Sequence, residues 1–427
     1  MIAYLSNFIK NIYQLESKIA FYPSLLSVLG LAFAFTMYYF ESIGISKYLL
    51  ENAPVLVVND TETARNLLTT FIAGLISIMV FSFSMVMILL NQASSNFSPR
   101  ILPGLISNRR HQIILGIYNF TLLYCIFTLV SIEPEGNKYQ LPGFSVLLAI
   151  FAMTVCLGAF IYFIHSISQE IQVNNIMDRI FYSAKARLQK LIDLENDDDV
   201  NVPQTSKWCP ITSHRSGYFQ DLNLKALKEI AQENNIQLEI IPTKGTYILP
   251  KQLLFKSNVK LDDKIIDEVN GAFRFSKSEL IEDNYLLAFK QITEIAVKAM
   301  SPGINDPGTA INAIDYLTEL FSLRLYKNDV NIVYSDKNEP MLKINTIDFQ
   351  EVLFQVMAAL RTYCSHDIII VQKLFYMLNY LKDKDHIKLE IYHKAISLEI
   401  ENLHEDATNS LKNKADLAIV SQLYSNT

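Results

Sequence analysis

The sequence predicts a mainly α-helical membrane protein with four transmembrane helices, the last continuing into the cytoplasm. A C-terminal cytoplasmic region with a small α+β module and a helical domain is expected to follow. The 427 residues are 50% hydrophobic and only 19% charged, with a mean hydropathy of +0.19, whereas soluble globular proteins carry about 25% charged residues. Four long apolar runs, all free of Asp, Glu, Lys and Arg, lie within the first 165 residues. These two observations exclude a purely cytosolic protein.

Each apolar run is long enough to cross a membrane, because about 20 apolar residues in a helix span a hydrocarbon core of about 30 Å. The runs are Phe21–Phe40, Leu67–Leu90, Ile113–Ile132 and Gly143–Ile164. No A-x-A cleavage site follows the first run, so we expect it to be retained. Lys and Arg gather in the second loop and after the fourth run, and the positive-inside rule therefore places both chain termini in the cytoplasm.

The second run carries a polar ridge. Thr70, Ser77, Ser84 and Asn91 recur every seven residues, and Phe81 lies on the same strip. Seven residues make nearly two helical turns, so these side chains share one face of the helix. Small hydroxyl residues, with the Thr70-x3-Gly74 pair, favour close helix packing in lipid. The alternative is that the ridge lines a hydrated pore, because small hydroxyls face water without carrying a charge.

The ends of the second run carry charged groups. Before it, Asn59 is expected to cap the helix and Glu62 to complete a capping box; if the ridge lines a pore, Asp60 and Glu62 become its negative outer mouth. After it come Arg100, Arg109 and Arg110. These arginines are expected to contact lipid phosphates, with a role in gating as the alternative.

We expect five segments along the chain. They are a cytoplasmic amphipathic leader over 1–20, the four-helix transmembrane domain over 21–165, a projecting helix with an acidic linker over 166–200, a small α+β module over 201–280 and a mostly helical domain over 281–427. An apolar stripe runs on past the fourth span, which predicts one continuous helix of about 50 residues, roughly 75 Å long. In the module, 236–241 and 246–249 are predicted to be strands joined by a Pro-Gly turn, and in the following domain 331–335 and 341–345 are predicted to form a hairpin.

The segment 301–309 predicts a corner between two helices. Pro302-Gly303 makes the turn, Asp306 suits the N-cap of the next helix, and Pro307 fits its first position. A well-capped corner is one interpretation. The other is a ligand or subunit contact formed by Ser301, Asn305, Asp306 and Thr309, because a helix N-terminus attracts anions.

Catalytic and cofactor motifs are missing from the sequence. It holds no GxxxxGK[ST], Rossmann glycine fingerprint, HExxH or GxSxG pattern. We therefore expect no enzyme activity, no catalytic residue, no cofactor and no metal, although His386, Glu390 and His393 share a helical face that could bind one. The net charge of −6 argues against a nucleic-acid partner.

Several short motifs resemble a known family. They are Phe97-Ser98-Pro99-Arg100, Ser216-Gly217-Tyr218, Gly245-x-Tyr247-Ile248 and, most distinctive, Ser301-Pro302-Gly303-Ile304-Asn305-Asp306-Pro307 followed by Thr309-Ala310. Over nearly its full length the chain is similar to a bacterial family of predicted membrane proteins, domain of unknown function 2254. The resemblance implies a multi-pass protein of the bacterial inner (cytoplasmic) membrane and brings no established activity.

Two functional hypotheses follow. In the first, the chain forms a homo-oligomeric ion channel or channel-like pore with a cytoplasmic gating domain, its partners being membrane lipids, its own copies and permeant ions. In the second, it is a membrane-anchored sensor or scaffold that binds a partner or a small anionic ligand through its cytoplasmic domain, at the 301–309 corner.

Overall fold

The computed structural model describes residues 20–96, 109–132, 141–170, 172–193, 203–276, 284–335, 339–383 and 390–426. The chain divides into two compact units, Met1–Gln172 and Val173–Thr427. The expected amphipathic leader over 1–20 lies almost wholly outside the described residues.

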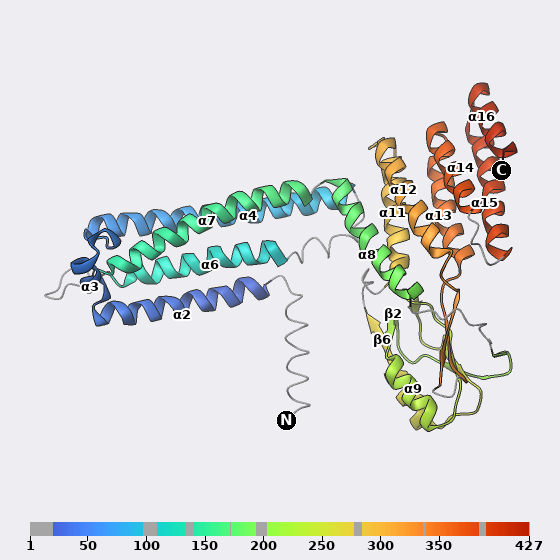
Figure 1. Ribbon diagram of the computed structural model, residues 1–427, viewed down its shortest axis with the longest axis horizontal. Helices are drawn as coiled ribbons and strands as arrows, with labels where there is room; N and C mark the ends of the chain where they lie inside the picture. The colour runs from blue at the N-terminus through green and yellow to red at the C-terminus, as the bar shows by residue number, and fades with distance from the viewer. Residues whose placement is uncertain are drawn as a thin grey trace. The chain divides into compact units, whose positions relative to one another are not determined.

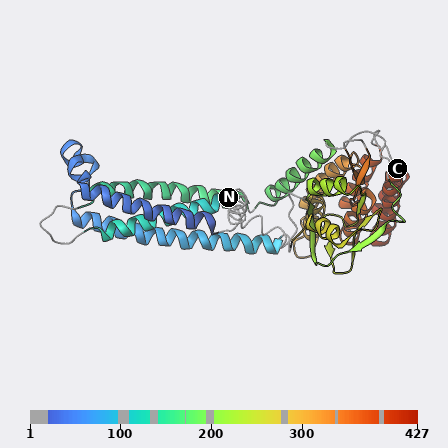
Figure 2. The same ribbon diagram turned by 90° about the horizontal axis from the view of Figure 1, so that it is seen from below.

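The N-terminal unit is a bundle of four long helices that run side by side (Figure 1, Figure 2). They are α2 (Phe21–Ile43), α4 (Thr61–Asn96), α6 (Arg109–Val130) and α7 (Gly143–Glu170). All four are long and apolar enough to cross a membrane, which confirms the four predicted spans. The short helices α3 (Ile45–Asn52) and η1 (Pro54–Leu56) lie between α2 and α4 and contact α7.

Glycines allow α2 and α6 to approach each other closely. A Cβ added to Gly30 of α2 would lie 2.7 Å from both the Cα and the carbonyl oxygen of Phe120. A Cβ added to Gly116 of α6 would lie 3.1 Å from the carbonyl oxygen of Tyr22. Both distances are shorter than van der Waals contact, so only glycine fits these two positions without moving a helix.

The predicted continuous helix after the fourth span is interrupted. Helix α7 ends at Glu170, and a separate helix, α8 (Val173–Asp193), begins the C-terminal unit. The expected apolar stripe is present in α8, where Ile176, Ile180, Ala184 and Leu188 are buried. The stripe predicted which side chains are buried, but periodicity alone does not report whether the backbone is continuous, because a break of two residues keeps the same spacing.

The C-terminal unit contains two small sheets. The larger has the strand order β1-β5-β3-β8-β7 and the smaller β4-β2-β6. All their contacts are antiparallel except the parallel pair β3–β8. The strands are β1 (Cys209–Thr212), β2 (Gly217–Leu222), β3 (Leu238–Ile240), β4 (Tyr247–Ile248), β5 (Leu253–Ser257), β6 (Phe273–Ser276), β7 (Val330–Tyr334) and β8 (Pro340–Asn345).

The two strands predicted over 236–241 and 246–249 are present as β3 and β4, but they do not pair with each other. Strand β3 pairs with β5 and β8, whereas β4 pairs with β2 in the other sheet. The segment between these two strands forms the predicted turn, and through it the chain passes from one sheet to the other. The hairpin predicted for 331–335 and 341–345 is confirmed as β7–β8, and it joins the larger sheet across the expected domain boundary at residue 280.

Helices complete the C-terminal unit (Figure 1). They are α9 (Leu224–Glu233), α10 (Asp263–Gly271), α11 (Tyr285–Ala299), α12 (Pro307–Arg324), α13 (Phe349–Cys364), α14 (Ile368–Lys382), α15 (Glu390–Ser410) and α16 (Lys414–Ser425). Helix α8 packs on α11 and α12. Asp306 caps α12 through a side-chain hydrogen bond, as its sequence position predicts, and Asp367 caps α14 in the same way.

Candidate functional site

Helix α4 has two opposite faces, each with a seven-residue repeat. Leu68, Leu75, Ser82 and Leu89 are at most 1% exposed and form the face that packs into the bundle. The polar ridge Thr70, Ser77, Ser84 and Asn91 follows this buried row by two residues at every repeat. Two residues correspond to a rotation of about 200°, so the ridge lies on the side of the helix that points away from the bundle.

The ridge is exposed along its whole length in the single chain. Thr70, Ser77 and Ser84, together with Asn91, are all exposed. Phe81, on the same strip, is 47% exposed and contacts Phe160 of α7 edge to face. Within the described part of the bundle, the hydroxyl side chains of the ridge therefore do not form a packing seam between helices.

Each hydroxyl of the ridge donates to its own helix. Thr70 donates to the carbonyl of Asn66 at 2.7 Å, and Ser77 and Ser84 donate to carbonyls four residues earlier at 2.9 Å. A hydroxyl has one hydrogen to donate and two lone pairs that accept. With the hydrogen used inside the helix, the ridge presents a row of acceptor oxygens to its surroundings.

Gly74, the partner of Thr70 in the small-residue pair, does not mark a close helix contact within the chain. A Cβ added there would meet only the Cε methyl of Met153, at an ordinary distance of 3.7 Å. This contrasts with Gly30 and Gly116, where backbone atoms lie much closer. The described helices of the bundle thus make no close contact through Gly74.

The cap at the start of α4 differs by one residue from the expected one. Asp60, rather than Asn59, accepts a hydrogen bond from the backbone N–H of Thr63 at 2.7 Å and another from the Thr63 hydroxyl. These two bonds lower the pKa of Asp60 below its ordinary value. Asp60 and Glu62 are both exposed at this end of the bundle, so the two carboxylates expected at the outer mouth lie close together in the chain and face solvent.

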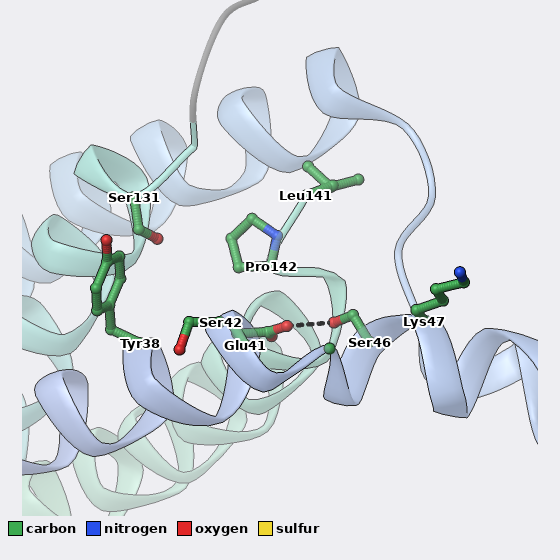
Figure 3. A pocket seen from close by; sticks show the side chains of 9 residues that line it. Tyr38, Glu41, Ser42, Ser46, Lys47, Ser131, Leu141 and Pro142 are labelled. Atoms are coloured by element: carbon green, nitrogen blue, oxygen red, sulfur yellow. Dashed lines mark hydrogen bonds between the residues drawn. The ribbon is translucent and has the colours of Figure 1, made fainter. Parts of the chain in front are cut away.

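A carboxylate that sequence reasoning assigned no individual role organises the same end of the bundle. Glu41 lines a small pocket of about 40 Å³ at the junction of α2, α3 and α7 (Figure 3). Its Oε1 accepts from the backbone N–H and the hydroxyl of Ser145, at 2.9 and 2.8 Å, and its Oε2 accepts from the hydroxyl of Ser46 at 2.6 Å. Glu41 therefore caps the N-terminus of α7, where a negative charge is favoured.

Local backbone geometry makes the Glu41 contact possible. Gly44, with a φ of +97°, ends α2 in the left-handed conformation and turns the chain into α3. Ser46, two residues later, then bonds to Glu41 and also accepts from the backbone N–H of Phe144 at 3.0 Å. The only sequence signal for this site is the acidic residue just before a glycine at the end of an apolar run.

At the opposite end of the bundle, two of the three expected arginines are described. Arg109 and Arg110 begin α6 and are exposed. The Arg109 guanidinium lies over the ring of Tyr22, 4.9 Å from its centroid. Arg100 lies outside the described residues. The Arg109 side chain thus lies beside α2 at the end of an apolar bundle, where lipid headgroups are expected.

The 301–309 corner uses its polar groups internally. The Asp306 carboxylate accepts from the backbone N–H of Thr309 at 3.1 Å and from its hydroxyl at 2.6 Å. The Ser301 hydroxyl donates to the carbonyl of Lys298 at 2.6 Å. Asn305 is exposed and has a φ of +50°, a left-handed turn position. The structure thus brings all four expected residues together as a capped corner, and it is exposed.

Among the described residues, no group of three or more His, Cys, Asp or Glu side chains is placed to hold a metal ion. Of the three side chains that suggested one from the sequence, Glu390 and His393 lie in α15, and His386 falls outside the described part of the chain. The free cysteines Cys125, Cys156 and Cys364 are buried, and Cys209 is half-buried.

Comparison with known proteins identifies the family. A family described as predicted membrane protein (DUF2254) matches residues 16–380. The chain belongs to this family. Two uncharacterized proteins, one from Mycobacterium bovis and one from Mycobacterium tuberculosis, are each 23% identical to it over 332 residues. That match covers 74% of this chain and 63% of each relative, so the chain spans less than two thirds of their length. No solved structure matches the chain.

Proposed function

We propose that this protein is a homo-oligomeric inner-membrane ion channel or channel-like pore, in which α4 helices from several copies surround a hydrated axis and the C-terminal units form a cytoplasmic gating domain. Both chain termini lie in the cytoplasm in this proposal, as the distribution of Lys and Arg indicates. The observation that carries the proposal is the position of the polar ridge on the outward face of α4, opposite its buried heptad row.

The chemistry of the ridge favours water over lipid as its neighbour. Lipid tails offer no donor to the acceptor oxygens of Thr70, Ser77 and Ser84, whereas water does. An oligomer that turns these faces toward a common axis hydrates the oxygens and leaves the apolar flanks of α4, such as Ile76 and Phe83, to lipid or to neighbouring helices.

The remaining features fit passive conduction. The ridge carries no ionisable side chain, unlike the intramembrane carboxylates and histidines on which proton-coupled transporters depend. At the outer end Asp60 and Glu62 would form a negative ring in an oligomer, which favours cations at low ionic strength. Membrane lipids, further copies of the chain and ions are thus the proposed partners.

The second candidate is a membrane-anchored sensor or scaffold that captures a partner at the 301–309 corner. The exposed apolar side chain of Ile304, 39% exposed beside Asn305, favours it. In this case the ridge is only a contact between membrane helices, and replacing its hydroxyls leaves function intact.

The test is conductance of the purified protein in a planar bilayer. The proposal predicts discrete, voltage-driven currents that the double variant Ser77→Leu/Ser84→Leu abolishes or reduces about tenfold. The control is Ile76→Leu/Phe83→Leu, which changes the preceding residue at the same two depths on the other flank of α4 and should keep the current. Silence of folded protein at every voltage, pH and membrane tension contradicts the pore, as does equal current from both double variants. If Asp306→Ala abolishes capture of a partner, and the Ser77→Leu/Ser84→Leu double variant does not, the result favours the scaffold instead.

A further inference from the structure

The C-terminal unit contains a cavity of about 350 Å³ that the pore does not require. It lies between α8, β2, the start of α11 and the β7–β8 hairpin, all of which belong to the same compact unit. Its volume falls in the range of pockets that hold small molecules. A space of this size inside a folded unit is far larger than the voids that ordinary core packing leaves.

The walls of the cavity are largely hydrocarbon and aromatic. Phe219 of β2 and Tyr285 of α11 contribute rings, and Leu286 contributes an aliphatic side chain. Such a lining excludes water from an apolar ligand body and favours its burial, at about 25 cal/mol per Å² of apolar surface. A ligand of this cavity therefore needs an apolar body.

The charges on the lining are mainly positive. Arg187, Lys244 and Lys327 line the cavity together with one carboxylate, Asp221. Asp221 already forms an ion pair with Lys244, so no other carboxylate of the lining is left to offset the charge of Arg187. A cation at an apolar wall is costly unless an anion is placed beside it.

The fold fixes Lys327 and leaves one donor of Arg187 unused. Lys327 is 2% exposed, and its Nζ donates to the carbonyl of Asn328 at 2.8 Å and to the side-chain oxygen of Asn331 at 3.4 Å. The Nε of Arg187 is buried and has no hydrogen-bond partner in the described part of the chain. A guanidinium at a cavity wall with a free donor is suited to a carboxylate or phosphate.

We propose that this cavity binds a small organic anion, with its carboxylate or phosphate toward Arg187 and its apolar body against Phe219, Tyr285 and Leu286. Binding restrains α8, the helix that follows the fourth span in the chain after residues 171 and 172, and so gives a soluble anion a route to act on the membrane unit. The binding itself holds whether or not α4 lines a pore.

Calorimetric titration of the full chain in lipid nanodiscs tests the proposal with three probes that share one two-ring body. The probes are 1-naphthyl phosphate, 1-naphthoate and the cation 1-naphthylmethylammonium. We expect saturable binding of at least one anion, one per chain, and none of the cation. Tighter binding of the phosphate assigns a dianionic head group, and equal binding of both anions shows that a carboxylate is sufficient.

Two variants and one control locate the site. Arg187→Gln should weaken binding of the anion about tenfold or more, the range expected for a lost hydrogen bond to a charged group. Lys190→Gln removes the same charge from an exposed position of α8 outside the lining, and it should leave the affinity unchanged. Leu286→Trp fills the cavity and should block binding without changing any charge. Near-ultraviolet circular dichroism confirms that each variant is folded.

Three results overturn the proposal. They are absence of saturable binding of both anions, equal affinity for the naphthyl cation, and anion affinity that neither Arg187→Gln nor Leu286→Trp changes. Should Arg187→Gln fail to fold, Leu286→Trp carries the same test.

Discussion

Replacing Glu41 tests whether one carboxylate holds the loop end of the membrane bundle together. Glu41 accepts three hydrogen bonds, from Ser46 and from the backbone and hydroxyl of Ser145. A hydrogen bond to a charged group contributes about 1.5–3 kcal/mol when buried, and loss of a helix cap costs about 1 kcal/mol. Because the Glu41 site is only partly buried, we expect Glu41→Ala to lose about 2–4 kcal/mol in total, and Glu41→Gln roughly half of that.

The assay is thermal unfolding of the purified protein in one detergent, followed by circular dichroism. For a unit of this size each kcal/mol lowers the Tm by about 2–4 °C, so Glu41→Ala should lower it by roughly 5–10 °C. Glu51→Ala removes the same charge from an exposed position in α3 and should change the Tm by about 1–2 °C at most. Equal shifts for the two variants would refute the capping role of Glu41.

Two further predictions concern packing and pH. Gly30→Ala should destabilise the bundle by about 1–3 kcal/mol, because the added Cβ would lie 2.7 Å from backbone atoms of Phe120; Gly158→Ala in α7, where the added Cβ meets nothing within 4 Å, is the control and should be neutral or slightly stabilising in the same thermal assay. Burial alone would raise the pKa of Glu239, but the hydrogen bonds from Lys343, Thr205 and Lys256 lower it below 4.5, so its stabilising contribution is present above pH 4.5 and is lost as the pH falls further. Unfolding of wild type and Glu239→Gln between pH 7 and pH 3.5 should therefore differ most at neutral pH and converge in acid; parallel curves would contradict this origin of acid sensitivity.

Local chemistry made parts of the fold predictable. The four spans follow from apolar runs that are long enough to cross a bilayer, and hydropathy detects them without any knowledge of contacts. The cap Asp306 was predicted because it bonds to the amide of Thr309, three residues away. Features of this kind depend on residues that are close together in the chain, so a short stretch of sequence is enough to predict them.

The features that the sequence did not predict depend mainly on contacts between residues far apart in the chain. Strand β3 pairs in parallel with β8, about a hundred residues later, and no turn signal marks such a pair. Glu41 likewise reaches Ser145 across the same kind of separation, so its capping role was hidden in a segment that read as loop. The break between α7 and α8 escaped notice because the apolar spacing continues across it.

The polar ridge lies between these two cases. Its membership was predictable from the seven-residue spacing of Thr70, Ser77 and Ser84. Leu68, Leu75 and Leu89 form a second repeat of large side chains offset by two residues. In lipid, large aliphatic side chains are as stable against the tails as inside the bundle, so the burial of the leucine row in the structure decides that the ridge, about 200° from it, points outward.

Cysteine accessibility at consecutive positions of α4 is the most direct test of a hydrated ridge. The background variant carries Cys209→Ser, since the other three cysteines are buried, and the pairs are Ile76→Cys with Ser77→Cys and Phe83→Cys with Ser84→Cys. A charged, membrane-impermeant thiol reagent reacts with thiolates, which form in water and not in lipid. We predict that cysteines at 77 and 84 react in the reconstituted protein at least about tenfold faster than those at 76 and 83. Equal protection of all four positions, or faster reaction at 76 and 83, would contradict a water-lined ridge.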